Sequence, residues 1–172
     1  AQDVIENEYL EELITKSDGN AIRLEQEIAL LIDTGYISIE KDKISTNNGD
    51  KPTVSPITFE DLIKLRLNAM TPAARNILYM AAIMGYRFAT GILCQASAIP
   101  AETTASLLGY LIQEMYITQV DDYTCEFKNL TLWKLIYQEA KNDLLYKENS
   151  ERLYKTLKPL ILSSNLQKLI SC

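Results

Sequence analysis

Carboxylates in close pairs are the residues of this chain with the most obvious capacity for chemistry. Three such pairs are present, Glu11-Glu12, Glu25 with Glu27, and Asp121-Asp122. Paired carboxylates can perform acid–base work or bind a cation, but only where a further group converges on them. Each pair is expected on a helix surface or in a turn, where solvated charge is the favoured interpretation. No metal site is therefore predicted.

Other catalytic groups are scarce in this sequence. The chain contains no histidine, so it lacks the usual general base, the Ser-His-Asp and Cys-His triads and most forms of zinc catalysis. Its cysteines, Cys94, Cys125 and Cys172, are far apart and show no Cys-x-x-Cys spacing. Neither a zinc ribbon nor a disulfide framework is indicated. We expect no catalytic residue here, and hence a chain that is not an enzyme by itself.

Composition indicates a folded, cytoplasmic body. With 172 residues, 47% of them hydrophobic and 23% charged, the chain can bury a core and form one domain or two small ones. The longest apolar run, Ile77–Met84, is much shorter than the roughly 20 residues that a membrane span needs. The odd number of scattered cysteines fits a reducing compartment. Because the sequence enters a helical pattern directly from Ala1, we expect a piece of a longer polypeptide.

The distribution of charge argues against nucleic acid as a partner. The formal net charge is −6, and no Lys or Arg occurs between Arg87 and Lys128. Affinity for phosphate polymers comes largely from Lys and Arg displacing counterions. The sequence therefore predicts no binding to nucleic acid or to an anionic membrane.

Residues 1–45 are predicted to form a first module of two helices and a small hairpin. The expected elements are helices over Glu8–Lys16 and Ala21–Asp33 and strands over Tyr36–Ile39 and Lys43–Ser45. Ser17–Asn20 breaks the first helix and caps the second. Residues 46–56 gather Asn, Gly, Pro, Thr and Ser, which is typical of a linker.

Residues 57–129 are predicted to form a winged-helix domain. The expected elements are a helix capped by Thr58 with Asp61, helices over Pro72–Met84, Thr90–Ala96 and Pro100–Met115, and a hairpin of Tyr116–Val120 with Tyr123–Phe127. Three helices and a hairpin in this order are typical of that fold. Residues 130–172 complete the chain with helices over Leu130–Tyr146 and Glu148–Leu162. The fold class predicted is thus mainly α.

The large apolar side chains of the second module are expected to fill its core. They lie at helical or turn spacing, which favours packing over a cofactor site; they are Tyr79, Met80, Met84, Tyr86 and Phe88. Trp133 follows the predicted hairpin, where a hydrophobic anchor is favoured over an exposed partner contact.

Three segments in this order, beginning at Ser17, Arg66 and Phe127, resemble the region that follows the P-loop core in signal-transduction ATPases of the STAND branch of the AAA+ class. Ser17–Glu25 is similar to that family's Ser-x-Gly-Asn-Pro-Phe-Phe-Leu-Glu segment. Arg66-Leu67, followed by Pro72–Phe88, resembles its "RL…P.AR.VL..AAVLG..F" stretch. Phe127–Asn129, with Tyr137 further on, resembles the Phe-Arg-His…Val-Tyr pattern that closes the family's winged helix.

This resemblance implies a helical lid with a small hairpin, then a winged helix that relays nucleotide state to an output domain. Such modules join a P-loop ATPase to class III adenylate cyclase domains, tetratricopeptide arrays or DNA-binding domains. The implied partners are the upstream ATPase core and the output domain of the same polypeptide. ATP and magnesium are expected only with the upstream P-loop, because no Gly-x-x-x-x-Gly-Lys-Ser/Thr stretch occurs here.

The nucleotide-proximal positions implied for the parent protein are Gly19, Asn20, Lys128 and Asn129. The sequence departs from the family pattern near these positions: Ala21 stands where the family has proline, Ile22 and Arg23 where it has two aromatic residues, and Asn129 where it has histidine. A plain helix stop and cap is the other interpretation of Gly19 and Asn20, and it is compatible with a lid loop near the nucleotide.

Two alternative functions remain open from the sequence. One is a winged-helix transcription regulator, but the helix that would enter the major groove, Pro100–Met115, contains no Lys or Arg. The other is a protein-interaction adaptor without ATPase ancestry. The adaptor differs from the lid and winged helix of a signalling ATPase only in which sequence precedes Ala1 in the parent protein.

Overall fold

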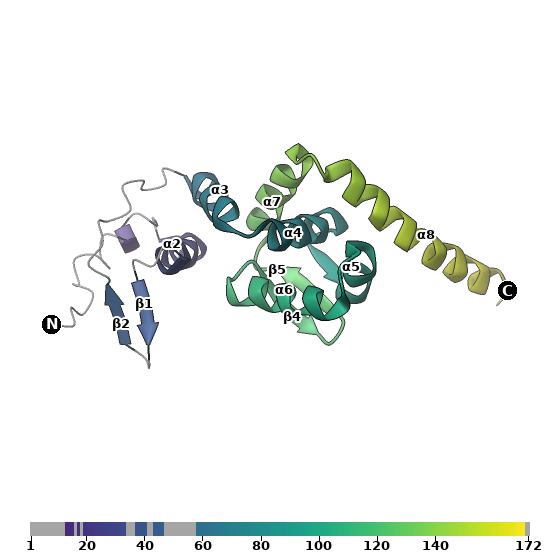
Figure 1. Ribbon diagram of the computed structural model, residues 1–172, viewed down its shortest axis with the longest axis horizontal. Coiled ribbons are helices and arrows are strands. Elements are labelled where there is room, and N and C mark those ends of the chain that lie inside the picture. Colours follow the sequence, from purple (N-terminus) through teal and green to yellow (C-terminus); the bar gives the residue numbers. More distant parts are fainter. Residues whose placement is uncertain are drawn as a thin grey trace. The chain divides into compact units, whose positions relative to one another are not determined.

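The chain folds mainly as α-helices, as predicted. The structure is a computed structural model that describes residues 13–15, 17, 19–33, 37–40, 43–46 and 58–170. Helices dominate these residues, with one two-stranded and one three-stranded antiparallel sheet among them. The chain divides into two compact units, Ala1–Met70 and Thr71–Cys172 (Figure 1).

The division after Met70 groups the helix of residues 59–69 with the first unit, whereas the sequence grouped it with the second module. Residues 47–57, which cover most of the expected linker, lie outside the described residues. The finer domain limits drawn from the sequence, 1–45, 46–56, 57–129 and 130–172, therefore stay predictions.

The described part of the first unit contains helix α2 (Ala21–Asp33), strands β1 (Ile37–Glu40) and β2 (Lys43–Thr46), and helix α3 (Phe59–Ala69). The strands pair antiparallel, from Ile37 opposite Thr46 to Glu40 opposite Lys43. The expected cap of α3 is confirmed: Thr58 Oγ1 accepts from the backbone N–H of Asp61, whose carboxylate accepts from the N–H of Thr58. Leu62, Ile63 and Leu67 form the buried side of α3, which packs against α2.

The second unit is organised around helix α4 (Pro72–Met84). Its start is the one predicted, with Thr71 Oγ1 accepting from the N–H of Ala74 and proline at the first turn. It ends at Gly85, whose φ of +135° favours glycine. The helix carries little polar surface, and Ile77, Leu78 and Met80 are fully buried.

Three short strands form the sheet of this unit: β3 (Arg87–Ala89), β4 (Ile117–Asp121) and β5 (Thr124–Phe127). Their spatial order is β3-β5-β4, and both pairings are antiparallel. The sequence predicted the hairpin of β4 and β5 but missed β3. Three residues are too few to show an alternating pattern, and Phe88 alone points into the core.

Helices α5 (Thr90–Ser97) and α6 (Ala101–Gln113) lie between β3 and β4 in the chain. The order α4-β3-α5-α6-β4-β5, with β5 in the middle of the sheet, is that of a winged helix. The turn between α5 and α6 is held by buried hydroxyls: Ser97 Oγ lies 3.3 Å from Thr104 Oγ1, and it accepts from the N–H of Ile99.

The trailing helices differ from their predicted limits. Helix α7 (Leu130–Asn142) ends before Asp143, and α8 (Tyr146–Ile170) begins earlier and runs further than expected. Asp143 causes the break, because its backbone is extended and its Oδ1 accepts from the N–H of Leu145 at 2.8 Å. Helix α8 continues through Pro159 and packs against α5 and α4 (Figure 1).

Phe127 is expected to be a main determinant of the stability of the second unit. Its side chain is fully buried, and its ring centroid lies 6.0 Å from that of Phe88 on the neighbouring strand. Phe127→Ala should lower the free energy of unfolding by about 3–5 kcal/mol, since it leaves a cavity. Tyr123→Ala, at a position on the same hairpin that is 77% exposed, is the matched control and should stay within about 0.5 kcal/mol. Urea unfolding measures both, and equal losses would contradict this packing.

Candidate functional site

Gly19 and Asn20 lie in the turn that precedes α2. Gly19 has φ +70°, a conformation that favours glycine, and among the described residues no atom beyond its chain neighbours lies within 4 Å of where its Cβ would be. Asn20 caps α2, since its Oδ1 accepts from the N–H of Arg23 at 3.2 Å. Both residues are exposed. The geometry is that of a helix stop and cap, and nearness to a nucleotide stays a prediction for the parent.

A buried polar cluster between α2 and α3 is a feature that the sequence did not reveal. Arg66 is 1% exposed and donates through Nη1 to Oε1 of the equally buried Gln26. Arg23 Nε donates to Glu27 Oε1 at 2.9 Å. The expectation that Glu27 is a solvated charge is therefore wrong, because it is buried and paired. A charged group this deep needs such partners to offset its lost hydration.

Lys128 and Asn129 lie at the junction between β5 and α7. The backbone N–H of Lys128 donates to the Tyr116 carbonyl at 3.1 Å, while its side chain is exposed. Asn129 caps α7, with Oδ1 accepting from the N–H of Leu132 at 2.8 Å. The junction thus places a lysine beside the positive end of a helix, where anions are favoured.

The side-chain amide nitrogen of Asn129 has no acceptor among the described residues. This atom, Nδ2, is buried. Buried donors without partners are uncommon and costly, and they recur where a ligand or partner supplies the missing acceptor. Among the predicted nucleotide-proximal residues, Asn129 has the buried side-chain donor without an acceptor in the described structure, while Lys128 presents an exposed ammonium group beside it.

The face of α6 that a DNA-binding winged helix would insert in the major groove is uncharged or acidic. Its exposed residues include Glu102, Thr103, Ser106, Tyr110 and Gln113. The wing adds Asp121 and Asp122, which are exposed as predicted. The pKa of Asp121 is lowered, chiefly because the backbone N–H of Tyr123 donates to its carboxylate. Ionised carboxylates at this end of the unit repel a phosphate backbone.

Trp133 anchors α7 to α4, in agreement with the anchoring role predicted from the sequence. Its Nε1 donates to the carbonyl of Ala82 at 3.0 Å, near the end of α4. Its ring stacks on Tyr137, with centroids 5.8 Å apart. Of the core candidates in this unit, Tyr79, Met80 and Phe88 are buried, while Met84 and Tyr86 are only partly so.

The structure brings the predicted site residues together in two pairs. Gly19 lies beside Asn20 in the first unit, and Lys128 beside Asn129 in the second. Within the described ranges no set of three or more Cys, Asp or Glu side chains could hold a metal ion. None of the described helices has both the length and the apolar character to cross a membrane.

Comparison with family models, curated proteins and solved structures yielded no match to the chain.

Two substitutions at Asn129 distinguish the contribution of its capping oxygen to stability from that of its buried amide nitrogen. Asn129→Ala removes the cap and should lower the free energy of unfolding by about 1 kcal/mol. Asn129→Ser keeps a capping oxygen and removes the buried donor, so it should be close to the native chain in stability. Urea unfolding of the two variants decides the point. If the serine variant lost as much as the alanine variant, the cap would not be what Asn129 contributes to folding.

Proposed function

We propose that this chain is the non-catalytic lid and winged-helix portion of a larger signalling P-loop ATPase, and that it relays nucleotide state to an output domain. The observation that carries the proposal is a winged helix whose α6 exposes no basic side chain. A winged helix without positive charge on that helix is poorly suited to DNA. It is well suited to a mechanical role inside a signalling protein.

The relay needs an element that moves as one body with the winged helix. Helix α8 has suitable ties to it: Asn149 Nδ2 donates to Asn76 Oδ1 on α4 at 2.7 Å, and Arg152 donates to the carbonyl of Ser97 at the end of α5. Asn149 and Leu153 are also buried in this packing. Rigid-body rotation of the unit would therefore carry α8 with it, as in other switching proteins.

The proposed partners are the upstream ATPase core and the output domain, of which a class III nucleotide cyclase is one kind that the resemblance implies. ATP and magnesium would bind to the core, with Gly19, Asn20, Lys128 and Asn129 as adjoining positions. Hydrolysis needs a phosphate cradle, a magnesium ligand and a group that positions water, and these belong to the P-loop core. A cytoplasmic location follows from the same proposal.

The proposal is tested first by the coding sequence that precedes this chain. A Gly-x-x-x-x-Gly-Lys-Ser/Thr motif between a strand and a helix should be encoded within a few hundred residues upstream. If a P-loop is found, Asn129→Ala in the intact protein should alter nucleotide affinity, whereas Asn142→Ala, at an exposed position on the same helix, should not. An upstream region without a P-loop would contradict the proposal and favour the adaptor.

The 172-residue chain alone should give no binding heat with magnesium-ATP in calorimetry. One or two hydrogen bonds to a charged group contribute about 1.5–3 kcal/mol each, which is too little to offset the entropy of association. Saturable binding with micromolar affinity would show a nucleotide site within these residues and contradict this expectation.

Salt-dependent binding of duplex DNA in a mobility assay would instead favour the transcription-regulator alternative.

A further inference from the structure

Helix α7 exposes a strip of apolar, aromatic and basic side chains at helical spacing. The members of this α7 strip are the exposed Leu130, Lys134 and Lys141 and the partly buried Trp133 and Tyr137, followed by the exposed Leu144 in the turn to α8. Residues three and four apart lie on one face of a helix, so these side chains form one continuous surface. The opposite side of α7, with Leu132 and Ile136, is buried against the unit.

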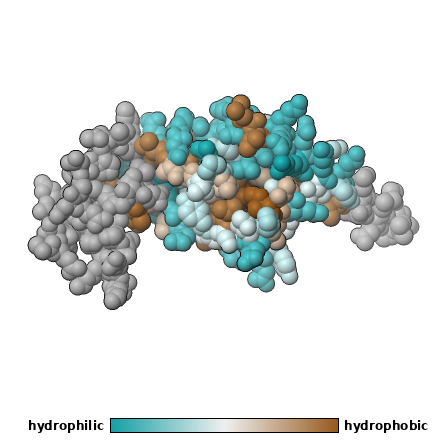
Figure 2. Space-filling model, viewed as in Figure 1, coloured by the Kyte–Doolittle hydropathy of each residue, from teal (hydrophilic) through white to brown (hydrophobic). Residues whose placement is uncertain are grey.

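The apolar members of the strip are far more exposed than the fold requires. Leu144 is 99% exposed and Leu130 is 51% exposed. The turn that presents Leu144 is fixed by hydrogen bonds from the backbone N–H groups of Leu145 and Tyr146 to Asp143. Figure 2 shows apolar surface projecting from the unit at the turn between α7 and α8. An ordered turn that exposes a leucine to water leaves apolar surface unburied. Covering this surface with a partner would contribute favourable free energy to binding.

The aromatic members are held in place before any partner arrives. Trp133 is fixed by its hydrogen bond to Ala82 and stacks on Tyr137. Lys141 Nζ lies 5.6 Å from the centroid of the Tyr137 ring. Ordered aromatic side chains lose little entropy when a partner binds, and for this reason they are common at the centres of interfaces.

The strip is basic in a chain that is acidic overall. Lys134 and Lys141 belong to it, Lys128 precedes it, and all three are exposed. None of these lysines is in an ion pair with a carboxylate of the described residues. The carboxylates of this segment are Glu139 and Asp143, and both are close enough to Tyr79 of α4 to act on its pKa. Burial is the main cause of the raised pKa of Tyr79, and these two charges add to it.

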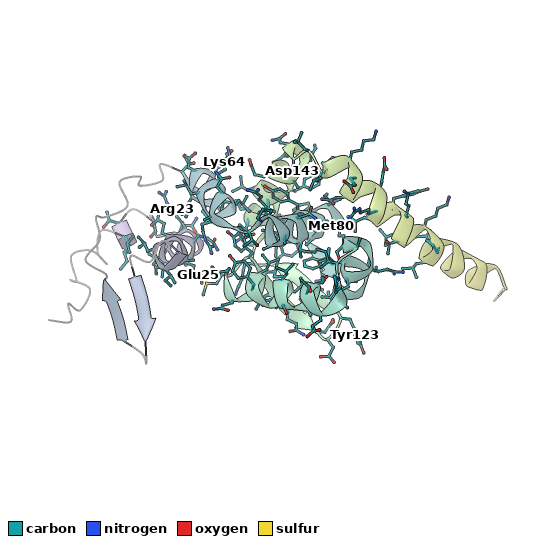
Figure 3. The ribbon with its side chains drawn as sticks, in the orientation of Figure 1. Arg23, Glu25, Lys64, Met80, Tyr123 and Asp143 are labelled. Carbon is teal, nitrogen blue, oxygen red and sulfur yellow. The ribbon has the colours of Figure 1, made fainter. Side chains whose placement is uncertain are left out.

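From this surface we propose that the α7 strip docks an acidic amphipathic helix of a protein partner. Lysines flanking a row of leucines and aromatic rings complement glutamates or aspartates that flank a row of apolar side chains. A nucleic acid would use the lysines and rings but would leave Leu130 and Leu144 uncovered. The Leu144 end of the strip lies away from the acidic wing, since Tyr123 and Asp143, the neighbour of Leu144, lie at opposite sides of the second unit (Figure 3). The proposal is independent of the ATPase relationship.

Trp133 makes the proposal directly measurable, because it is the only tryptophan in the chain and it lies in the strip. The probe is a synthetic helical peptide of about 15 residues, with leucines on one face and glutamates on the other. Titrating it into the full chain should change the Trp133 emission saturably, and added salt should weaken the binding. A peptide with lysine in place of every glutamate should give no saturable change. No response to the acidic peptide, or equal responses to both peptides, would overturn the proposal.

Surface variants assign the binding to the strip. Leu130→Glu and Leu144→Glu should each raise the Kd by about tenfold or more, as expected for central apolar contacts. Leu160→Glu on α8 is the matched control, because Leu160 is also 51% exposed, and it should leave the Kd unchanged. An effect of the control equal to that of Leu130→Glu would show binding outside the strip and overturn the proposal.

Charge reversal distinguishes the proposed partner from other anionic ligands. Lys134→Glu with Lys141→Glu should abolish binding of the glutamate peptide and create binding of the lysine peptide. Poly-uridine RNA and phosphatidylserine vesicles are tested in parallel on the native chain. A saturable Trp133 response to either, lost in Leu144→Glu, would replace the protein partner by a nucleic acid or a membrane and overturn the proposal.

Discussion

The burial of α4 is the constraint on which the second unit depends. Its middle turns carry Ile77, Leu78, Met80, Ala81 and Ala82 with no exposed surface. A helix that is apolar all round has to be covered on all sides. Helices α5, α6, α7 and α8 and strand β3 all pack against it, and in Figure 3 Met80 lies amid these elements. The winged-helix arrangement is in this sense the set of elements needed to cover one apolar helix.

Polar contacts then fix where each covering element ends. Trp133 donates to the carbonyl of Ala82 and so sets α7 against the end of α4, while Asn149 and Arg152 tie α8 to α4 and to the turn after α5. Each bond satisfies a group that packing would otherwise leave without a partner. The surface of the unit then differs from one side to another mainly in its charge. The wing and α6 lack basic residues, whereas α7 carries lysines on its outer face.

The sequence predicted those parts of the fold that local chemistry determines. The caps at Thr58 and Thr71, the end of α4 at Gly85 and the hairpin before Asn129 all follow from residue types at fixed spacing. Strand β3 was missed because its three residues are ordered by pairing with β5, which is distant in the sequence. The buried state of Arg66 and Glu27 was missed for a related reason. A charged residue looks solvated until the partner helix that buries it is known. Likewise, the sequence pointed to Asn129, but only the packing around its amide shows a buried donor that has no partner among the described residues.

Residues 71–172 contain the elements that enclose α4, so this segment should fold without the first unit. The most direct test is to express this segment alone and follow its unfolding in urea through the fluorescence of Trp133, which is bonded to α4. A single cooperative transition, from a native emission distinct from that of a solvated indole, is the predicted result. A gradual, non-cooperative change, or fluorescence typical of a fully solvated indole without denaturant, would contradict it.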